Sequence, residues 1–275
     1  MWVLLTNRES PTFFLAEKVR ANKKLAWINV NIFADGYDIE YCNRFYQKMD
    51  RVIAVSNELY SLLGKELPWM KDRLRSVYDI VIQDVIRDMA KLASKEIDCN
   101  KSTIKLVTVG RLVDQKNYLL ACESAKILAD RRGFAFKWYF VGEGVMRKSI
   151  ENRINELGLQ QKVFLLGFKE NPYPYMSQAD IYVQTSSYEG FCLTLAEARI
   201  LHRPIVSTNF DVVHDQIIDR ENGLIAEIAP ESVADKIQEL IENESLRNKI
   251  IQNLKKENNT TSTTEIQKFY SIIEN

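Results

Sequence analysis

Residues 186–198 read SSYEGFCLTLAEA, join an apolar strand to an apolar helix and contain two carboxylates, Glu189 and Glu197. The run 181–185 (IYVQT) before them is short, β-branched and aromatic, which is typical of a buried strand. The nearly continuous apolar residues of 191–202 predict a mostly buried helix. A buried carboxylate costs free energy unless it is paired or hydrogen-bonded. Glu197 lies inside the predicted helix and therefore requires a partner, for which sugar or ribose hydroxyl groups are suitable donors. Glu189 lies just ahead of the helix, where the exposed N–H groups and the helix dipole favour anions.

Strand and helix patterns alternate regularly around this stretch, over residues 103–258. Strands are predicted near 104–109, 136–141, 163–166, 181–185, 204–207 and 224–226, and helices near 118–131, 146–157, 191–202 and 232–243. This alternation predicts a complete doubly wound, Rossmann-like α/β domain with a parallel sheet. Ligands bind such folds beyond the carboxyl ends of the strands, so we expect the candidate site in the loops there.

Residues 1–83 predict a second α/β domain that is only partial. Its strands are expected near 2–5, 25–29, 52–55 and 75–78, and its helices near 12–20, 39–49 and 57–64. About four parallel strands that begin without a glycine-rich first turn make a poor folding unit. We therefore expect the missing strands to come from a preceding segment or from a partner chain.

Two further segments lie outside these domains: a connecting segment and a terminal helix. Residues 84–102 combine a helical stretch with a polar linker, which is typical of a domain boundary. Residues 259–275 begin with the end of a polar tail and return to helical spacing, with Ile266, Phe269 and Ile273 on one side. We expect this amphipathic terminal helix to pack against the first domain.

The composition excludes several classes of protein. The 37 basic residues balance the 37 acidic residues, so the chain lacks the basic excess of a nucleic-acid binder. Four well-separated cysteines and only two histidines argue against a metal site or a disulfide framework and fit a reducing cytosol. The longest apolar runs are far shorter than the ~18 residues of a membrane helix. We expect a cytoplasmic location, and peripheral attachment to the inner face of the plasma membrane stays open.

The loop after the first strand of the second domain contains Gly110, Arg111 and Lys116. Its two cations together could hold a diphosphate, Arg by a fork of donors and Lys as a point charge. Considered alone, the loop is better explained by two solvated charges.

The next two loops carry weaker signals. Gly142-Glu143-Gly144 would let a ligand approach the backbone closely, but its spacing fits a simple tight turn equally well. Phe168 lies on a rim, 167–172, that is able to offer backbone groups to a base. The aromatic residues here, Phe168, Tyr173 and Tyr175, more often pack than stack.

Taken together, these motifs resemble those of family 4 glycosyltransferases of the GT-B class, particularly bacterial enzymes that build capsular or surface polysaccharides. That family has a Gly-Arg-Leu…Lys loop, a Gly-Glu-Gly turn, and two glutamates separated by seven residues, in this order. In this sequence they are Gly110, Arg111, Leu112 and Lys116, then Gly142, Glu143 and Gly144, then Glu189 and Glu197.

The resemblance implies a retaining, hexosyltransferase-type enzyme that moves a sugar from a nucleotide-diphospho-sugar to a glycan or lipid-linked acceptor. Catalytic roles would fall to Glu189, at the donor sugar, and to Arg111 and Lys116, at the leaving diphosphate. With these cations in the role that a metal plays elsewhere, neither a metal nor another cofactor is expected. Donor binding would fall to Gly110, Gly142, Glu143, Gly144, Phe168, Gly190, Phe191, Cys192, Leu193, Thr194 and Glu197, the last holding the ribose hydroxyls.

Residues 16–28 also resemble the family, but the residues that follow depart from it. Asn29 stands where the family has a histidine near the donor sugar, and Asn31 where it often has aspartate. Asparagine can hydrogen-bond a hydroxyl but cannot carry a proton charge. Two alternatives stay open: a catalytically incomplete donor-binding module, or half of a split glycosyltransferase, and a GT-B sugar-nucleotide epimerase, which shares the architecture but not these motifs.

Overall fold

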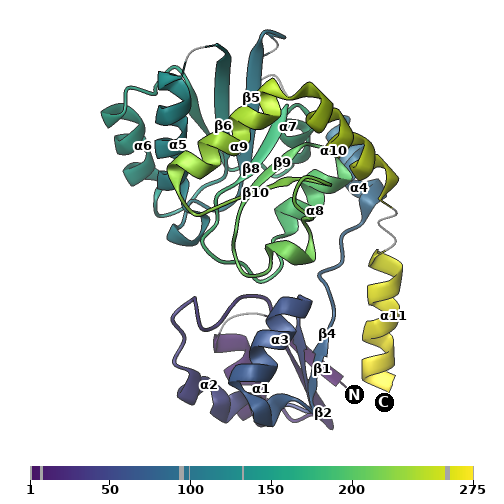
Figure 1. Cartoon of the computed structure of the whole chain (residues 1–275). Helices are drawn as coiled ribbons and strands as arrows, with labels where there is room; N and C mark the ends of the chain where they lie inside the picture. The colour runs from purple at the N-terminus through teal and green to yellow at the C-terminus, as the bar shows by residue number, and fades with distance from the viewer. Residues whose placement is uncertain are drawn as a thin grey trace. The chain divides into compact units, whose positions relative to one another are not determined.

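The computed structural model describes residues 2–6, 9–92, 96–98, 100–131, 133–257 and 261–274 (Figure 1). The chain forms two compact units. The first comprises Met1–Val81, Tyr188–Cys192 and Thr260–Asn275, and the second comprises Ile82–Ser187 and Leu193–Asn259. Each unit contains one parallel sheet with helices, which confirms the α/β fold class. The expected polar linkers fall partly on 93–95, 99 and 258–260, which lie outside the described residues.

The first unit is built on a four-stranded sheet in the order β1-β2-β3-β4. These strands are β1 (Trp2–Thr6), β2 (Lys23–Ile28), β3 (Arg51–Ala54) and β4 (Leu74–Ser76). The helices are α1 (Glu9–Lys18), α2 (Ile39–Tyr46), α3 (Asn57–Glu66), a 3₁₀ turn η1 (Pro68–Met70) and α11 (Thr261–Glu274). Asp38 and Ser56 start α2 and α3, because their side chains accept hydrogen bonds from Tyr41 N and Leu59 N.

Helix α11 packs on one face of this sheet. Its Ile272 joins a buried cluster with Leu25 and Ile53, and the rings of Phe269 and Trp27 lie 5.6 Å apart between centroids. The helix is therefore held by the same apolar contacts that form the core of the first unit.

The second unit is built on a six-stranded parallel sheet in the order β10-β9-β8-β5-β6-β7. Its strands are β5 (Thr103–Val109), β6 (Ala135–Val141), β7 (Val163–Gly167), β8 (Ile181–Gln184), β9 (Ile205–Thr208) and β10 (Leu224–Ala226). Residues of β8 and β9 are buried on both faces, as expected for strands covered by helices on each side.

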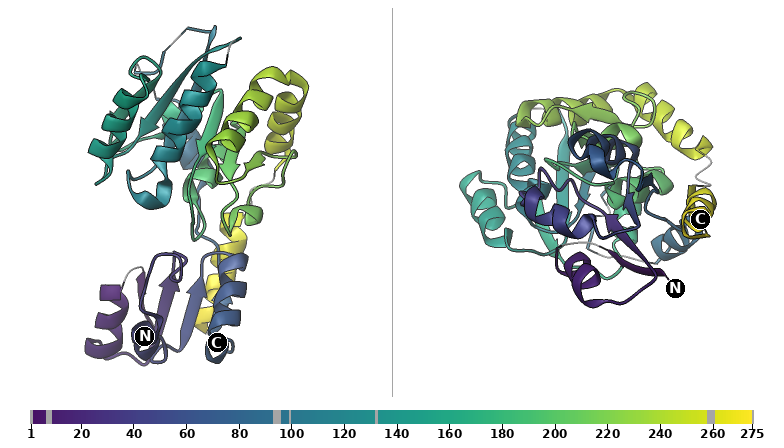
Figure 2. Two further views of the ribbon diagram at one scale, coloured as in Figure 1. Left: turned by 60° about the vertical axis from the view of Figure 1, so that its left-hand side comes forward. Right: turned by 90° about the horizontal axis from the view of Figure 1, so that it is seen from below.

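The helices of the second unit form two groups. In one, α5 (Tyr118–Asp130) contacts α6 (Arg147–Glu156) and α9 (Pro230–Glu242), which is followed by α10 (Glu244–Lys256). In the other, α4 (Gln83–Ala90) contacts α7 (Tyr173–Ser177) and α8 (Leu193–Ile200). Helices α9 and α10 are the yellow-green pair of Figure 2. Trp138 and Phe140 of β6 are fully buried in the core between α5, α6 and the sheet.

Helix α8 is shorter than the helix predicted at 191–202, and two left-handed residues explain the difference. Cys192 has a φ of 69° just before the helix, and His202 has a φ of 54° just after it. Neither backbone conformation can continue a right-handed helix. The sequence pattern also missed α7 and α10. Helix α10 is separate from α9 because the Asn243 side chain accepts a hydrogen bond from Leu246 N and starts a new helix.

Candidate functional site

The loops that carry the predicted site of the second unit follow neighbouring strands. Strands β8, β5, β6 and β7 are adjacent in the sheet and parallel, so their carboxyl ends lie along one edge. The loop after β5 contains Gly110, Arg111 and Lys116, and the loops after β6 and β7 contain Gly142 and Phe168. The structure therefore brings these predicted residues to one edge of a single unit.

The loop after β5 is held by local contacts that leave one cation unpartnered. The Tyr118 hydroxyl donates to Gly110 O at 3.0 Å, and the Thr185 hydroxyl donates to Lys116 O at 2.9 Å. The Lys116 side chain lies along Gly110, since a Cβ added to that glycine would be 3.5 Å from Lys116 Cε. Arg111 is exposed, and within the described part of the chain its side chain makes neither a hydrogen bond nor an ion pair.

The glycines of the Gly-Glu-Gly turn make room for this neighbouring loop. A Cβ on Gly142 would lie 1.9 Å from Gly110 O, and one on Gly144 would lie 2.4 Å from Leu112 O. Leu112 N donates to Glu143 O at 2.9 Å, which ties the two loops together. The close approach that these glycines permit is thus to another loop of the protein, a packing reason that the sequence pattern did not show.

The rim after β7 is tied to the connecting segment. Lys169 pairs with Glu96 at 2.7 Å, and the Tyr175 hydroxyl donates to the same carboxylate. These partners lower the pKa of Glu96. Phe168 does not pack into this rim, because 72% of it is exposed. Its ring is therefore available to a ligand or to solvent.

Glu197 has one hydrogen-bond donor in the described structure. The Tyr173 hydroxyl donates to Glu197 Oε1 at 3.0 Å, and among the described residues no group donates to Oε2. Burial raises the pKa of Glu197 to about 7, while the Tyr173 hydrogen bond and the positive charge of Lys116 oppose this rise. The pKa of Tyr173 is raised by burial and by the Glu197 charge.

Tyr173 is a site residue that sequence reasoning missed. It lies in α7, a five-residue helix that follows Pro172, and it meets Glu197 of α8 only through tertiary packing. The sequence signal was its place in an aromatic cluster after the third strand, but that cluster was interpreted as packing.

A buried polar network supports the start of α8. The Tyr182 hydroxyl donates to Gln184 Oε1 at 2.8 Å, and Gln184 Nε2 donates to Ser186 Oγ at 2.6 Å. The Thr194 hydroxyl donates to the same Gln184 oxygen at 3.2 Å. Gln184 is 1% exposed, so it positions the first turn of the helix from within the core.

Residues Tyr188–Cys192 belong to the first unit, although their neighbours in sequence belong to the second. A Cβ on Gly190 would lie 2.0 Å from Asn29 O, and the Phe191 ring stacks on Tyr78 with centroids 5.4 Å apart. Glu189 is buried at 5% exposure. Asn29 Oδ1 is also buried and has no hydrogen-bond partner among the described residues.

No cluster of three or more metal-ligating side chains occurs among the described residues. Within the same residues, no helix combines the length and hydropathy needed to cross a bilayer.

Residues 91–257 match the family described as "Glycosyl transferases group 1", which covers more than half of the chain. The chain belongs to this family.

Two bacterial relatives illustrate the likeness in sequence. The poly(ribitol-phosphate) alpha-N-acetylglucosaminyltransferase of Staphylococcus aureus is 34% identical over 142 residues, which are 50% of this chain and 28% of that protein. The N-acetylgalactosamine-N,N'-diacetylbacillosaminyl-diphospho-undecaprenol 4-alpha-N-acetylgalactosaminyltransferase of Campylobacter jejuni is 32% identical over 145 residues, 52% of this chain and 38% of that protein. The matched part of this chain thus spans less than half the length of either relative.

The fold is shared with a solved structure. The crystal structure of HepE from Anabaena in complex with UDP-glucose superposes with a TM-score of 0.77 over 90% of this chain and 72% of that one, at 16% identity. Its similarity, like that of other glycosyltransferase structures, confirms the predicted GT-B fold.

Proposed function

We propose that this chain is a glycosyltransferase that binds a nucleotide-diphospho-sugar in its second unit and transfers the sugar to a glycan or lipid-linked acceptor. The observation that carries the proposal is the hydrogen bonding of the Glu197 carboxylate. One carboxylate oxygen is held by Tyr173 and the other has no donor among the described residues, as a ribose-binding carboxylate requires. The family supports the reaction class, and the names of relatives support a role in polysaccharide biosynthesis.

The diphosphate of the donor would bind beside Arg111 and Lys116. Arg111 is exposed and unpartnered, and Lys116 lies along Gly110 in the same loop. Two cations in one loop would stabilise the negative charge that develops on a leaving diphosphate, without a metal or another cofactor. The backbone N–H groups at the start of α8, from Leu193 and Thr194, would add to this stabilisation.

The finer assignments follow from the resemblance. We propose retention of anomeric configuration, deprotonation of the acceptor with help from the leaving phosphate, and contact of Glu189 with the donor sugar. We also propose a cytoplasmic location, with peripheral attachment to the membrane for a lipid-linked acceptor. Nuclear magnetic resonance of the first-formed product tests the stereochemistry, since an inverted anomer would refute retention.

The donor site is tested by nucleotide-sugar binding and by slow donor hydrolysis or transfer. We expect Glu197→Gln and Lys116→Gln each to weaken binding or turnover by about tenfold or more, because each removes a charge-assisted contact. Glu231→Gln and Lys148→Gln make the same chemical changes at exposed positions of the same unit and should leave both unchanged. Equal rates in all four variants would refute the proposed site.

A second candidate function is a donor-binding module without turnover, and Asn29 favours it. Its buried side-chain oxygen lacks a partner among the described residues, and asparagine cannot take a proton charge. Calorimetry that detects donor binding without turnover, together with turnover gained in Asn29→His, would support this module. Transfer by the unmodified chain would exclude it.

A further inference from the structure

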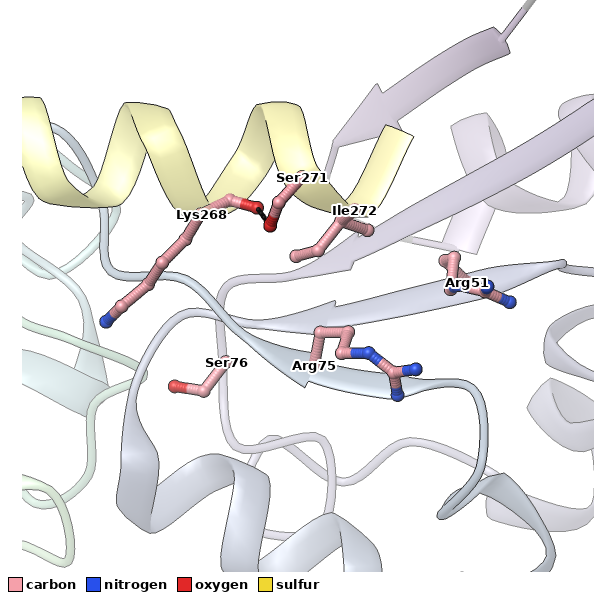
Figure 3. A pocket seen from close by; sticks show the side chains of 6 residues that line it. All are labelled: Arg51, Arg75, Ser76, Lys268, Ser271 and Ile272. Carbon is pink, nitrogen blue, oxygen red and sulfur yellow. Dashed lines mark hydrogen bonds between the residues drawn. The ribbon is translucent and has the colours of Figure 1, made fainter. Parts of the chain in front are cut away.

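A cavity of about 320 Å³ lies within the first unit, apart from the residues proposed to bind the donor (Figure 3). It is formed by strands β3 and β4 and by helix α11. The residues that line it are Arg51, Arg75, Ser76, Lys268, Ser271 and Ile272. We call it the Arg51–Arg75 pocket.

The two arginines project from the same face of the sheet. Arg75 is paired in register with Ile53, and alternation along β3 places Arg51 on the face of Ile53. Ile53 packs against Ile272, so this is the face that α11 covers. In Figure 3 the side chains of Arg51 and Arg75 extend the same way, whereas that of Lys268 extends in the opposite direction.

The charges of the pocket are unevenly balanced. Lys268 is neutralised by Glu265 at 2.5 Å. Arg51 donates to Asp50 O at 3.0 Å, and Arg75 donates to Asp72 O at 3.0 Å and Leu74 O at 2.7 Å. These acceptors are main-chain carbonyl groups, and among the described residues neither arginine forms an ion pair. Two positive charges therefore remain uncompensated there.

Each guanidinium group also keeps unused donors. Arginine carries five N–H bonds, and the hydrogen bonds described above use only one nitrogen, Nη1, of each side chain. A purely structural role explains part of the arrangement. The cations lie near the carbonyl end of α11, and arginine stems cover apolar surface. Neither the contact with the helix end nor the covering of apolar surface requires a cavity beside two guanidinium groups that form no ion pair.

We propose that the Arg51–Arg75 pocket binds a phosphate-bearing anion. Two uncompensated guanidinium groups offer two positive charges, which match the charge of about −1.5 to −2 on a phosphate monoester near pH 7. A carboxylate would neutralise only one of them. The forked donors also suit the three acceptor oxygens of a phosphate. The anion is either a soluble phosphate monoester or phosphatidic acid, since the headgroup of that lipid is itself a phosphate monoester.

The first experiment follows the two side chains directly. Inorganic phosphate is titrated into the full chain while the arginine Nε–Hε signals are recorded by nuclear magnetic resonance. The signals are assigned by their loss in Arg51→Gln and Arg75→Gln. We expect both to shift and saturate together, and each single variant to weaken phosphate binding by about tenfold or more at the remaining arginine. Arg20, which is exposed in the same unit, supplies the control signal and should not move.

The second experiment separates the two sources of the anion. The full chain, the double variant Arg51→Gln/Arg75→Gln and the control Arg20→Gln are sedimented with phosphatidylcholine vesicles, with or without phosphatidic acid. Binding that needs phosphatidic acid and falls about tenfold in the double variant alone assigns the pocket to a lipid headgroup. A saturating shift with inorganic phosphate and no such vesicle binding assigns it to a soluble phosphate. If the Arg51 and Arg75 signals do not shift with phosphate, and the double variant sediments with the vesicles as Arg20→Gln does, the proposal is wrong, whatever the donor site does.

Discussion

Single residues determine how the candidate donor site responds to pH, and Glu197 is the main example. Burial raises its pKa to about 7 from an ordinary value of 4.5. Between these values the native carboxyl keeps its proton while the unfolded one releases it, so this group makes the free energy of unfolding fall as the pH rises. Glu197→Gln removes this titration.

We therefore expect Glu197→Gln to gain stability relative to the wild type between about pH 4.5 and about pH 7, by up to ~3 kcal/mol in the free energy of unfolding. Urea unfolding of the full chain at several pH values measures the gain. A stability difference that does not change with pH would contradict the raised pKa.

Tyr173 should control the same titration through its hydrogen bond to Glu197 Oε1. The bond favours the ionised carboxylate and lowers its pKa, so Tyr173→Phe should raise that pKa further. If the ionised form binds the ribose, donor affinity in Tyr173→Phe will reach its plateau at a higher pH than in the wild type. Tyr175→Phe alters the same helix without touching Glu197, and its pH profile of donor binding should match the wild type.

Gly142 of the candidate site and Gly64 of helix α3 differ in the contacts that an added methyl group would make. Gly142 has a φ of 150°, and an added Cβ would lie 1.9 Å from Gly110 O. Gly142→Ala should therefore lower the free energy of unfolding by ~2 kcal/mol or more. Gly64 lies in helix α3 with its nearest contact at 3.9 Å, so Gly64→Ala should raise it by ~0.5–1 kcal/mol. Denaturant unfolding of both variants tests whether the two changes in the free energy of unfolding have opposite signs.

At the scale of elements, apolar strands were the most predictable feature of the chain. Parallel strands covered on both faces have continuous apolar sequences, so β5, β6, β8, β9 and β10 lie within one residue of the predicted bounds. Helix ends were less predictable, because Cys192 and His202 adopt left-handed conformations that are uncommon for residues other than glycine. Helix α7 was missed because five residues carry too little periodicity.

The features of the candidate site also differ in how far the sequence could predict them. Glu197 could be selected as a candidate from the sequence because a carboxylate within an apolar helix is unusual. Arg111 and Lys116 became candidates only through the resemblance to a family motif, since two charges in a loop are common. The Tyr173 hydrogen bond and the packing of Gly142 on Gly110 depend on distances between loops, which no local pattern contains.

Helix α11 offers a matched test of packing. Ile272 is 8% exposed in the core cluster with Leu25, while Ile266 is 38% exposed on the same helix. Ile272→Ala should lower the free energy of unfolding by ~2–4 kcal/mol, and Ile266→Ala should change it by less than ~1 kcal/mol. Thermal and urea unfolding compare the two variants. Equal losses would show that α11 is not held by this cluster.

At the scale of the whole molecule, the two units are interleaved along the chain. The first is made of three segments and the second of two, so the backbone passes between them four times. The exchange at Tyr188–Cys192 could not be predicted from sequence, because five residues in the middle of a strand–loop–helix pattern give no sign of it. It depends on the fit of Gly190 against Asn29 O, which is a tertiary contact.

This interleaving leads to a prediction about removal of the last segment. A chain that ends at residue 257 lacks α11 and with it the Ile272 and Phe269 contacts on the first sheet. All of β5 to β10 and the Glu197–Tyr173 pair remain. Hydrogen exchange should accelerate in peptides from β2 and β3 while those from β5 and β6 keep their protection, because local stability follows local burial. Donor affinity should stay within about twofold of the full chain, since α11 contributes no residue to the proposed donor site. If protection of β5 and β6 were lost as well, the second unit would depend on α11, and the division of the chain into two separately stabilised units would have to be abandoned.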